Sequence, residues 1–183
     1  MGKLLIKNAT VITEGNRLEE DVLIEGEVIS SVSKNIQIDS DTEVIDADGL
    51  ILIPGMIDDQ VHFREPGLTH KGNISSESKA AIAGGVTSYI EMPNTSPNTT
   101  TIEEFNKKIS LASIDSYCNF SFMFGGTNDN LDEIKKIDPT EVAGIKLFLG
   151  SSTGKMLIDN LNSIETIFSS TSLPISSHCE DEQ

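Results

Sequence analysis

Side chains that can bind metal ions or carboxylates gather in one short stretch, residues 54–67, which begins and ends with a Pro-Gly turn signal. If the stretch is a strand, successive side chains point to opposite faces. One face then carries Asp58, Gln60, His62 and Arg64, and the other carries Ile57, Asp59, Val61 and Phe63. Desolvating such polar groups is costly without partners, so we interpret the stretch as a metal and substrate site at the carboxyl end of a barrel strand. The alternative is a solvated edge strand whose polar residues share no role.

The three histidines lie in different settings along the chain. His62 ends the strand just described, His178 ends the last expected strand, and His70 lies in a loop after residue 68. A single histidine is more often a structural group than a ligand, but imidazoles at two strand ends of one barrel are placed as zinc ligands are. We therefore predict that His62 and His178 bind metal and that His70 does not.

Lys146 lies inside an apolar strand, residues 142–149. Its neighbours Ile145 and Leu147 share a face that is expected to pack against helices, so Lys146 points into the barrel together with Phe148. Burial lowers a lysine pKa, and the neutral amine can then react with CO₂ to form a carbamate that bridges two metal ions. An inward lysine paired with a carboxylate is the alternative, and the residues alone leave both open.

Arg64 and Asn94 are candidates for substrate binding. Arg64 closes the first barrel strand, and Asn94 follows the next one after Met92-Pro93. A guanidinium fork and an amide suit a planar carboxylate, although Asn94 is equally explained as a turn residue. Residues 150–155 superficially resemble a phosphate loop but lack its spacing and its final Ser or Thr, so we predict a plain loop there.

After residue 67 the expected strands and helices alternate. Strands are expected at 86–92, 117–124, 142–149 and 173–178, and helices at 73–83, 101–112, 131–137 and 160–169. Alternation of this kind indicates parallel βαβ units, either in an open doubly wound sheet or in a (β/α)₈ barrel. No glycine-rich dinucleotide fingerprint follows the first strand, which favours the barrel. A whole barrel needs about 250 residues, so residues 51–183 hold about five βα units.

The first 50 residues have a different pattern. Short strands are expected at 4–12, 21–25, 28–32 and 43–46, and the apolar run 50–53 leads into the polar stretch. The predicted fold class is therefore α/β: a partial (β/α)₈ TIM barrel, residues 51–183, preceded by a small N-terminal β-sandwich module, residues 1–50.

Composition narrows the range of partners. The formal net charge is −16, which argues against nucleic acid and anionic membranes but allows a small anionic substrate held by a local arginine. The sequence has no apolar run near the roughly 20 residues of a membrane helix, and its N-terminal apolar run is too short for a secretory signal. Two cysteines without close spacing indicate a reducing compartment, so we expect a cytoplasmic protein.

Five motifs together resemble the dihydroorotases of the amidohydrolase superfamily: residues 54–67, 83–88, 91–95, 144–148 and 178–181. The resemblance spans the whole chain. It implies a zinc-dependent hydrolase, with one or two zinc ions, that interconverts N-carbamoyl-L-aspartate and L-dihydroorotate in pyrimidine biosynthesis. Allantoinases and dihydropyrimidinases are the alternatives, and Arg64 favours dihydroorotase because allantoinases usually lack this arginine.

The resemblance also implies roles for single residues. His62 would bind the first metal, Lys146 would be the carboxylated bridging lysine, and His178 would bind the second metal. Arg64 and Asn94 would hold the substrate carboxylate.

The sequence departs from the family pattern in two respects. Gln60 stands where the family usually has a histidine, so it would be a weaker, neutral ligand. This departure also supports the alternative of a catalytically dead subunit that is a structural partner of another pyrimidine enzyme. The family's other metal-binding histidine and its general-base aspartate would lie beyond Gln183. We therefore expect the 183-residue chain alone to be inactive and poorly stable, and to be completed by a C-terminal half or by a homo-oligomer.

Overall fold

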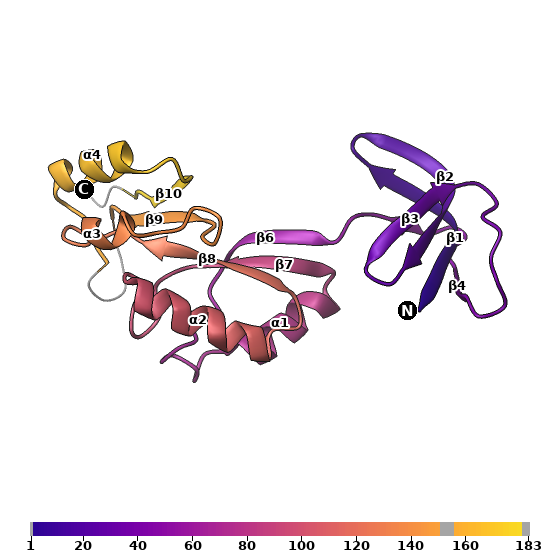
Figure 1. Ribbon diagram of the computed structural model, residues 1–183, viewed down its shortest axis with the longest axis horizontal. Coiled ribbons are helices and arrows are strands. Elements are labelled where there is room, and N and C mark those ends of the chain that lie inside the picture. Colours follow the sequence, from indigo (N-terminus) through magenta and orange to yellow (C-terminus); the bar gives the residue numbers. More distant parts are fainter. Residues whose placement is uncertain (1, 151–155, 181–183) are drawn as a thin grey trace. The chain divides into compact units, whose positions relative to one another are not determined.

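Two units of different construction make up the chain, Met1–Pro54 and Gly55–Gln183. A computed structural model describes residues 2–150 and 156–180 (Figure 1). Most of the predicted loop 150–155 lies outside the described residues, as does the end of the motif 178–181.

Strand β1 (Lys3–Thr13) organises the first unit because it pairs with three other strands. It runs antiparallel to β2 (Asn16–Glu25) and parallel to both β4 (Glu43–Asp46) and β5 (Ile51–Leu52), while β3 (Val28–Ser33) extends the sheet beyond β2. The small core lies on one face of this sheet and consists of Ala9, Val11, Val22 and Ala47 with partly buried aliphatic neighbours.

The structure corrects one expectation for the first unit. The run 50–53 was expected to lead into the barrel, but Ile51 and Leu52 pair with Thr10 and Val11 of β1. The units consequently divide after Pro54 and not after residue 50. The expected β module is one mixed sheet, and the described part of residues 2–54 contains no second sheet that would complete a sandwich.

The second unit is built on a parallel sheet in the order β10-β9-β8-β7-β6 (Figure 1). The strands are β6 (Met56–Val61), β7 (Val86–Glu91), β8 (Asn119–Gly125), β9 (Gly144–Phe148) and β10 (Ile175–His178). Each strand pairs in parallel with the next one along the chain, as βαβ units require. The predicted partial barrel is therefore confirmed.

Helices connect these strands. They are α1 (Ile74–Ala83), α2 (Ile102–Asp115), α3 (Leu131–Ile134) and α4 (Leu161–Ser170). Asn73, Thr101 and Asn160 cap α1, α2 and α4 by accepting hydrogen bonds from backbone N–H groups of the first turn, a stabilisation of about 1 kcal/mol per cap. None of the helices among the described residues is long and apolar enough to cross a membrane.

One face of the parallel sheet is covered by these helices. A single buried cluster joins strand residues such as Tyr89, Phe122 and Leu147 to helix residues such as Phe105 and Ile167. Fully burying side chains of this size contributes about 1.5–3 kcal/mol each. Because alternate strand residues point away from this cluster, the opposite face of the sheet forms the inside of the partial barrel.

Strand β6 breaks the alternation that was expected for the polar stretch. Asp58 is paired with Tyr89 and Val61 with Glu91, so two residues of β6 lie between these pairs against one residue of β7. Paired residues of neighbouring strands share a face, and both Tyr89 and Val61 belong to or pack on the helix-facing core. Asp58 and Val61 therefore lie on the same side, and the prediction that Asp58 shares a face with His62 was wrong. The extra residue is a bulge, which sequence periodicity does not signal.

Candidate functional site

Lys146 is the most deeply placed of the candidate residues. Only 3% of it is exposed, and every residue of β9 is buried. Its Nζ donates to Ser176 Oγ at 3.3 Å and to Gln60 Oε1 at 3.5 Å, and it lies 5.5 Å from the centroid of the Phe148 ring. Both hydrogen-bond partners are neutral, and burial lowers the pKa of the Lys146 amine. The Lys146 amine therefore lies inside the barrel and binds a proton less strongly than an exposed lysine does.

His62 lies beside Asn94 just after the end of β6. Its Nδ1 is 2.8 Å from Asn94 Oδ1. An amide oxygen only accepts hydrogen bonds, so Nδ1 carries the proton and Nε2 keeps a free lone pair. Partial burial lowers the pKa of His62, and the charges of Arg64 and Lys146 lower it further, whereas the bond to Asn94 acts in the opposite direction. A neutral imidazole with one nitrogen oriented by a hydrogen bond is the form that binds metal ions.

His178 ends β10 on the same face as Lys146. Ser176 is paired with Lys146 and His178 with Phe148, so the two strands present these side chains on one side. The rings of Phe148 and His178 are 6.2 Å apart, and His178 Nε2 is 3.4 Å from Glu180 Oε2.

Arg64 and Asn94 come from the segments that follow β6 and β7. Asn94 is buried and uses its carbonyl oxygen to orient His62, which leaves its NH₂ group for another partner. Arg64 adopts the left-handed conformation with a φ of 72°, and its backbone N–H donates to Glu91 Oε1 at 3.1 Å. This contact fixes an unusual backbone conformation at the point where the guanidinium leaves the chain.

The described residues include some of the donors that a metal site would need. Lys146 contacts both Gln60 and Ser176, and these two residues also line an inner hollow of about 250 Å³. Residues 2–150 and 156–180 contain no group of three His, Cys, Asp or Glu side chains that could hold a metal ion. The donors fit a carbamate-type centre only in part, through two imidazoles and a buried amine that must gain an oxygen donor from CO₂.

Sequence reasoning missed a buried ion pair next to these residues. Glu91 at the end of β7 and Lys108 on α2 are both fully buried, and Lys108 Nζ lies 2.9 Å from Glu91 Oε2. A signal was present, because Phe105, Lys108 and Ala112 follow helical spacing and form the buried stripe of α2. A lysine on such a stripe requires a buried partner.

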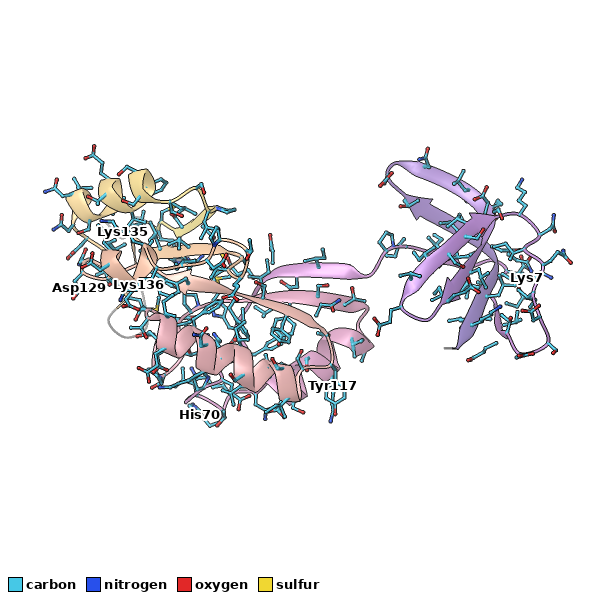
Figure 2. The ribbon with its side chains drawn as sticks, in the orientation of Figure 1. Lys7, His70, Tyr117, Asp129, Lys135 and Lys136 are labelled. Carbon is cyan, nitrogen blue, oxygen red and sulfur yellow. The ribbon has the colours of Figure 1, made fainter. Side chains whose placement is uncertain are left out.

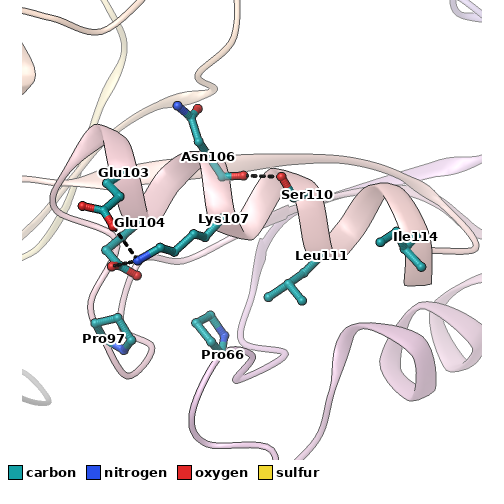
Figure 3. A pocket seen from close by; sticks show the side chains of 9 residues that line it. All are labelled: Pro66, Pro97, Glu103, Glu104, Asn106, Lys107, Ser110, Leu111 and Ile114. Carbon is teal, nitrogen blue, oxygen red and sulfur yellow. Dashed lines mark hydrogen bonds and ion pairs between the residues drawn. The ribbon is translucent and has the colours of Figure 1, made fainter.

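Two other features lie apart from the candidate residues. His70 is exposed in the segment that leads to α1, and Figure 2 shows its side chain at the lower edge of the view, beside the helices. A larger hollow of about 720 Å³ runs along α2 between Pro66, Pro97 and Ile114 (Figure 3). None of the predicted metal or substrate ligands lines it, so its size does not indicate the site of chemistry.

A parallel half-barrel with imidazoles at two strand ends and a buried lysine on its inner face is the arrangement of an amidohydrolase-type barrel protein. Solved structures agree with this class. The chain is similar to an L-hydantoinase (dihydropyrimidinase) from Arthrobacter aurescens, at 28% identity and a TM-score of 0.91, over 100% of this chain and 42% of that one. It is also similar to a D-hydantoinase (dihydropyrimidinase) from Thermus sp., at 32% identity and a TM-score of 0.78, over 97% and 40% of the two chains.

The curated relatives indicate a particular family within this class. Residues 49–123 match the family model described as dihydro-orotase-like. The chain is 35% identical to a dihydroorotase of Aquifex aeolicus over 100% of its own length and 44% of the relative, and 35% identical to an allantoinase of Salmonella choleraesuis over 86% and 34%. The chain belongs to the dihydroorotase-like family of amidohydrolases, and it spans less than half the length of these relatives.

Proposed function

We propose that the chain is the N-terminal part of a zinc-dependent cyclic amide hydrolase, a dihydroorotase that interconverts N-carbamoyl-L-aspartate and L-dihydroorotate in the pyrimidine biosynthesis of the cytoplasm. The observation that carries the proposal is the buried amine of Lys146, which has two neutral partners on the inner face of the half-barrel. A core lysine without a carboxylate partner contributes little to stability, whereas a neutral amine has a chemical use. The dihydroorotase relatives agree with this reading.

The proposed metal ligands are His62, the carbamate of Lys146, and His178, with Gln60 as a weak neutral donor. The neutral Lys146 amine would add to CO₂ and lose a proton, which gives an anionic oxygen donor. When bound, zinc would supply an activated water and polarise the substrate carbonyl. A general base would come from outside the 183 residues.

The remaining site residues would bind the substrate and orient His62. The guanidinium of Arg64 would bind the substrate carboxylate in two-point fashion. Asn94 would keep the proton of His62 on Nδ1, so that Nε2 faces the reaction centre. Its NH₂ group would donate a second hydrogen bond to the same carboxylate.

Substitution of Arg64 by methionine tests the substrate class. Losing a charged hydrogen bond of about 1.5–3 kcal/mol should lower kcat/KM for dihydroorotate by roughly 10- to 150-fold. Turnover of dihydrouracil, a ring without a carboxylate, should change little. Steady-state kinetics of the intact enzyme on both rings measure this, with Arg17→Met, an exposed arginine of β2, as the matched control. Undiminished dihydroorotate turnover, or equal losses on both rings, would contradict the role of Arg64 and favour an allantoinase or dihydropyrimidinase activity.

A catalytically dead structural subunit is the second candidate, and the contact between Gln60 and Lys146 favours it. An amide oxygen that accepts from the Lys146 ammonium stabilises the unmodified lysine. Metal analysis of the intact protein separates the two candidates, because a dead subunit would have neither zinc nor turnover.

Substitution of Gln60 by histidine gives a further test of the proposed zinc site. Imidazole is a standard zinc ligand and a side-chain amide is not, so we expect zinc affinity to rise about tenfold, or ~1.4 kcal/mol. Competition with a fluorescent chelator measures the affinity, and Gln37→His in the N-terminal unit is the control. An unchanged affinity would mean that position 60 does not face the metal.

A further inference from the structure

The ion pair of Glu91 and Lys108 contacts backbone as well as side chain. Glu91 Oε1 accepts from the N–H of Arg64 at 3.1 Å, and Lys108 Nζ donates to the carbonyl oxygen of Met92 at 3.0 Å. Lys108 Nζ also lies 2.9 Å from Glu91 Oε2, so the two charges form a buried ion pair. Lys108 Nζ also lies 5.0 Å from the centroid of the Phe122 ring. Each charged group therefore has a backbone partner besides its opposite charge.

The two backbone partners lead to the two proposed carboxylate ligands. The N–H held by Glu91 belongs to Arg64 itself, at a φ of 72° that non-glycine residues rarely adopt. The carbonyl held by Lys108 belongs to Met92, two residues before Asn94. Glu91, the last residue of β7, holds the segment after β6 through Arg64, and Lys108 holds the segment after β7 through Met92. The one ion pair therefore fixes these two segments against each other.

Further hydrogen bonds limit how these segments can relax. The N–H of Met92 donates to the carbonyl of Val61 at 3.0 Å, and the N–H of Ser96 donates to the carbonyl of Pro66 at 3.1 Å. These bonds join the segments at either side of Arg64 and Asn94. The contact from Glu91 holds the N–H of Arg64, and the N–H of Leu68 donates to the carbonyl of Arg64 at 3.0 Å.

We propose that Glu91 and Lys108 are positioning residues, which hold the backbone of Arg64 and of the segment carrying Asn94 so that both side chains meet one carboxylate. The substrate part of this inference rests on the proposed function. Burying two charges in a helix-facing core is costly, and both charged groups also bond to the backbone of the segments that carry the proposed site.

Two double variants separate positioning from simple stability. Glu91→Gln with Lys108→Met, and Glu91→Leu with Lys108→Met, both remove the buried charges. The glutamine keeps an oxygen that accepts from the Arg64 N–H, and the leucine does not. We expect KM for dihydroorotate to be about tenfold higher in the leucine pair than in the glutamine pair, as the loss of roughly one hydrogen bond predicts. Their kcat values should agree within about twofold, and their kinetics on dihydrouracil should not differ.

A measurement without substrate tests the same geometry. Amide hydrogen exchange at Arg64 should be faster in the leucine pair than in the glutamine pair, and exchange at an amide of β1 in the first unit should be equal in both. If the wild-type protein turns over no cyclic amide, the proposed function fails, and the exchange at Arg64 still decides the positioning. Equal exchange at Arg64 in the two variants, or equal KM values in an active enzyme, would overturn the proposal.

Discussion

Replacement of Lys146 by methionine should lower kcat/KM for dihydroorotate by roughly a thousandfold or more and remove most of the bound zinc. A metal centre supplies several kcal/mol of transition-state stabilisation, and each 1.36 kcal/mol corresponds to a factor of about ten. Methionine has a similar length and suits the buried position of Lys146 beside the Phe148 ring. The fold should therefore persist while the oxygen donor is lost. Zinc content by elemental analysis and steady-state kinetics measure the two effects together.

The matched control is Ser176→Ala. It removes the hydroxyl that lies 3.3 Å from Lys146 Nζ but leaves the amine. Losing one neutral hydrogen bond of about 1 kcal/mol should reduce activity less than tenfold. If Lys146→Met retains zinc and turnover, Lys146 is a structural residue and the carbamate proposal is wrong. If Lys146→Met and Ser176→Ala lose the same amount of activity and of bound zinc, the effect comes from local packing.

Replacement of Lys108 alone by methionine should give the largest loss of stability, about 3–5 kcal/mol, because it leaves the carboxylate of Glu91 buried without its counter-charge. The double variant with Glu91→Gln should recover most of this loss, since no buried charge remains. Urea unfolding of the intact protein at pH 7 measures the free energies of unfolding. Lys107→Met is the control from the preceding position of α2, where the ammonium is exposed and contacts Glu103 and Glu104. It should change stability little.

The stability of Lys108→Met should also depend on pH. Burial raises the pKa of Glu91 in the native protein, while Lys108 and the backbone N–H groups lower it. Without Lys108 the native pKa rises further above the unfolded value, so the native state binds the extra proton and stability falls as pH rises through that range. The difference from wild type should therefore be smaller near pH 5 than at pH 7. If the difference in unfolding free energy between wild type and Lys108→Met does not change with pH, Glu91 is already protonated in both proteins over this pH range.

The sequence was sufficient to predict the partial barrel and the direction of Lys146. Ile145 and Leu147 mark the helix-facing side of β9, and a period of two then sends Lys146 to the inside. The alternation of strands and helices after residue 67 also follows from local residues. These features depend on neighbours in the chain, which a sequence displays directly.

Features that depend on distant partners were not predicted. Ile51 and Leu52 have the pattern of a barrel strand, but β1 pairs with them across about 40 residues. The partner of Lys108 is on another element, and a glutamate before Met92-Pro93 looks like an ordinary strand end. The contact of Asn94 with His62 likewise requires the two strand ends to be neighbours. Local periodicity contains no information on such pairings.

The bulge in β6 has a consequence for length variation in this part of the chain. Two residues of β6, Asp59 and Gln60, lie against one residue of β7, Ile90, between the pairs at Asp58 and Val61. Deletion of one of them would restore a regular ladder and rotate everything after it by half a pleat, which would turn the imidazole of His62 towards the hydrophobic layer. Spacing within this strand is thus under stricter constraint than the identity of its side chains, and a single-codon deletion there would be more damaging than most replacements.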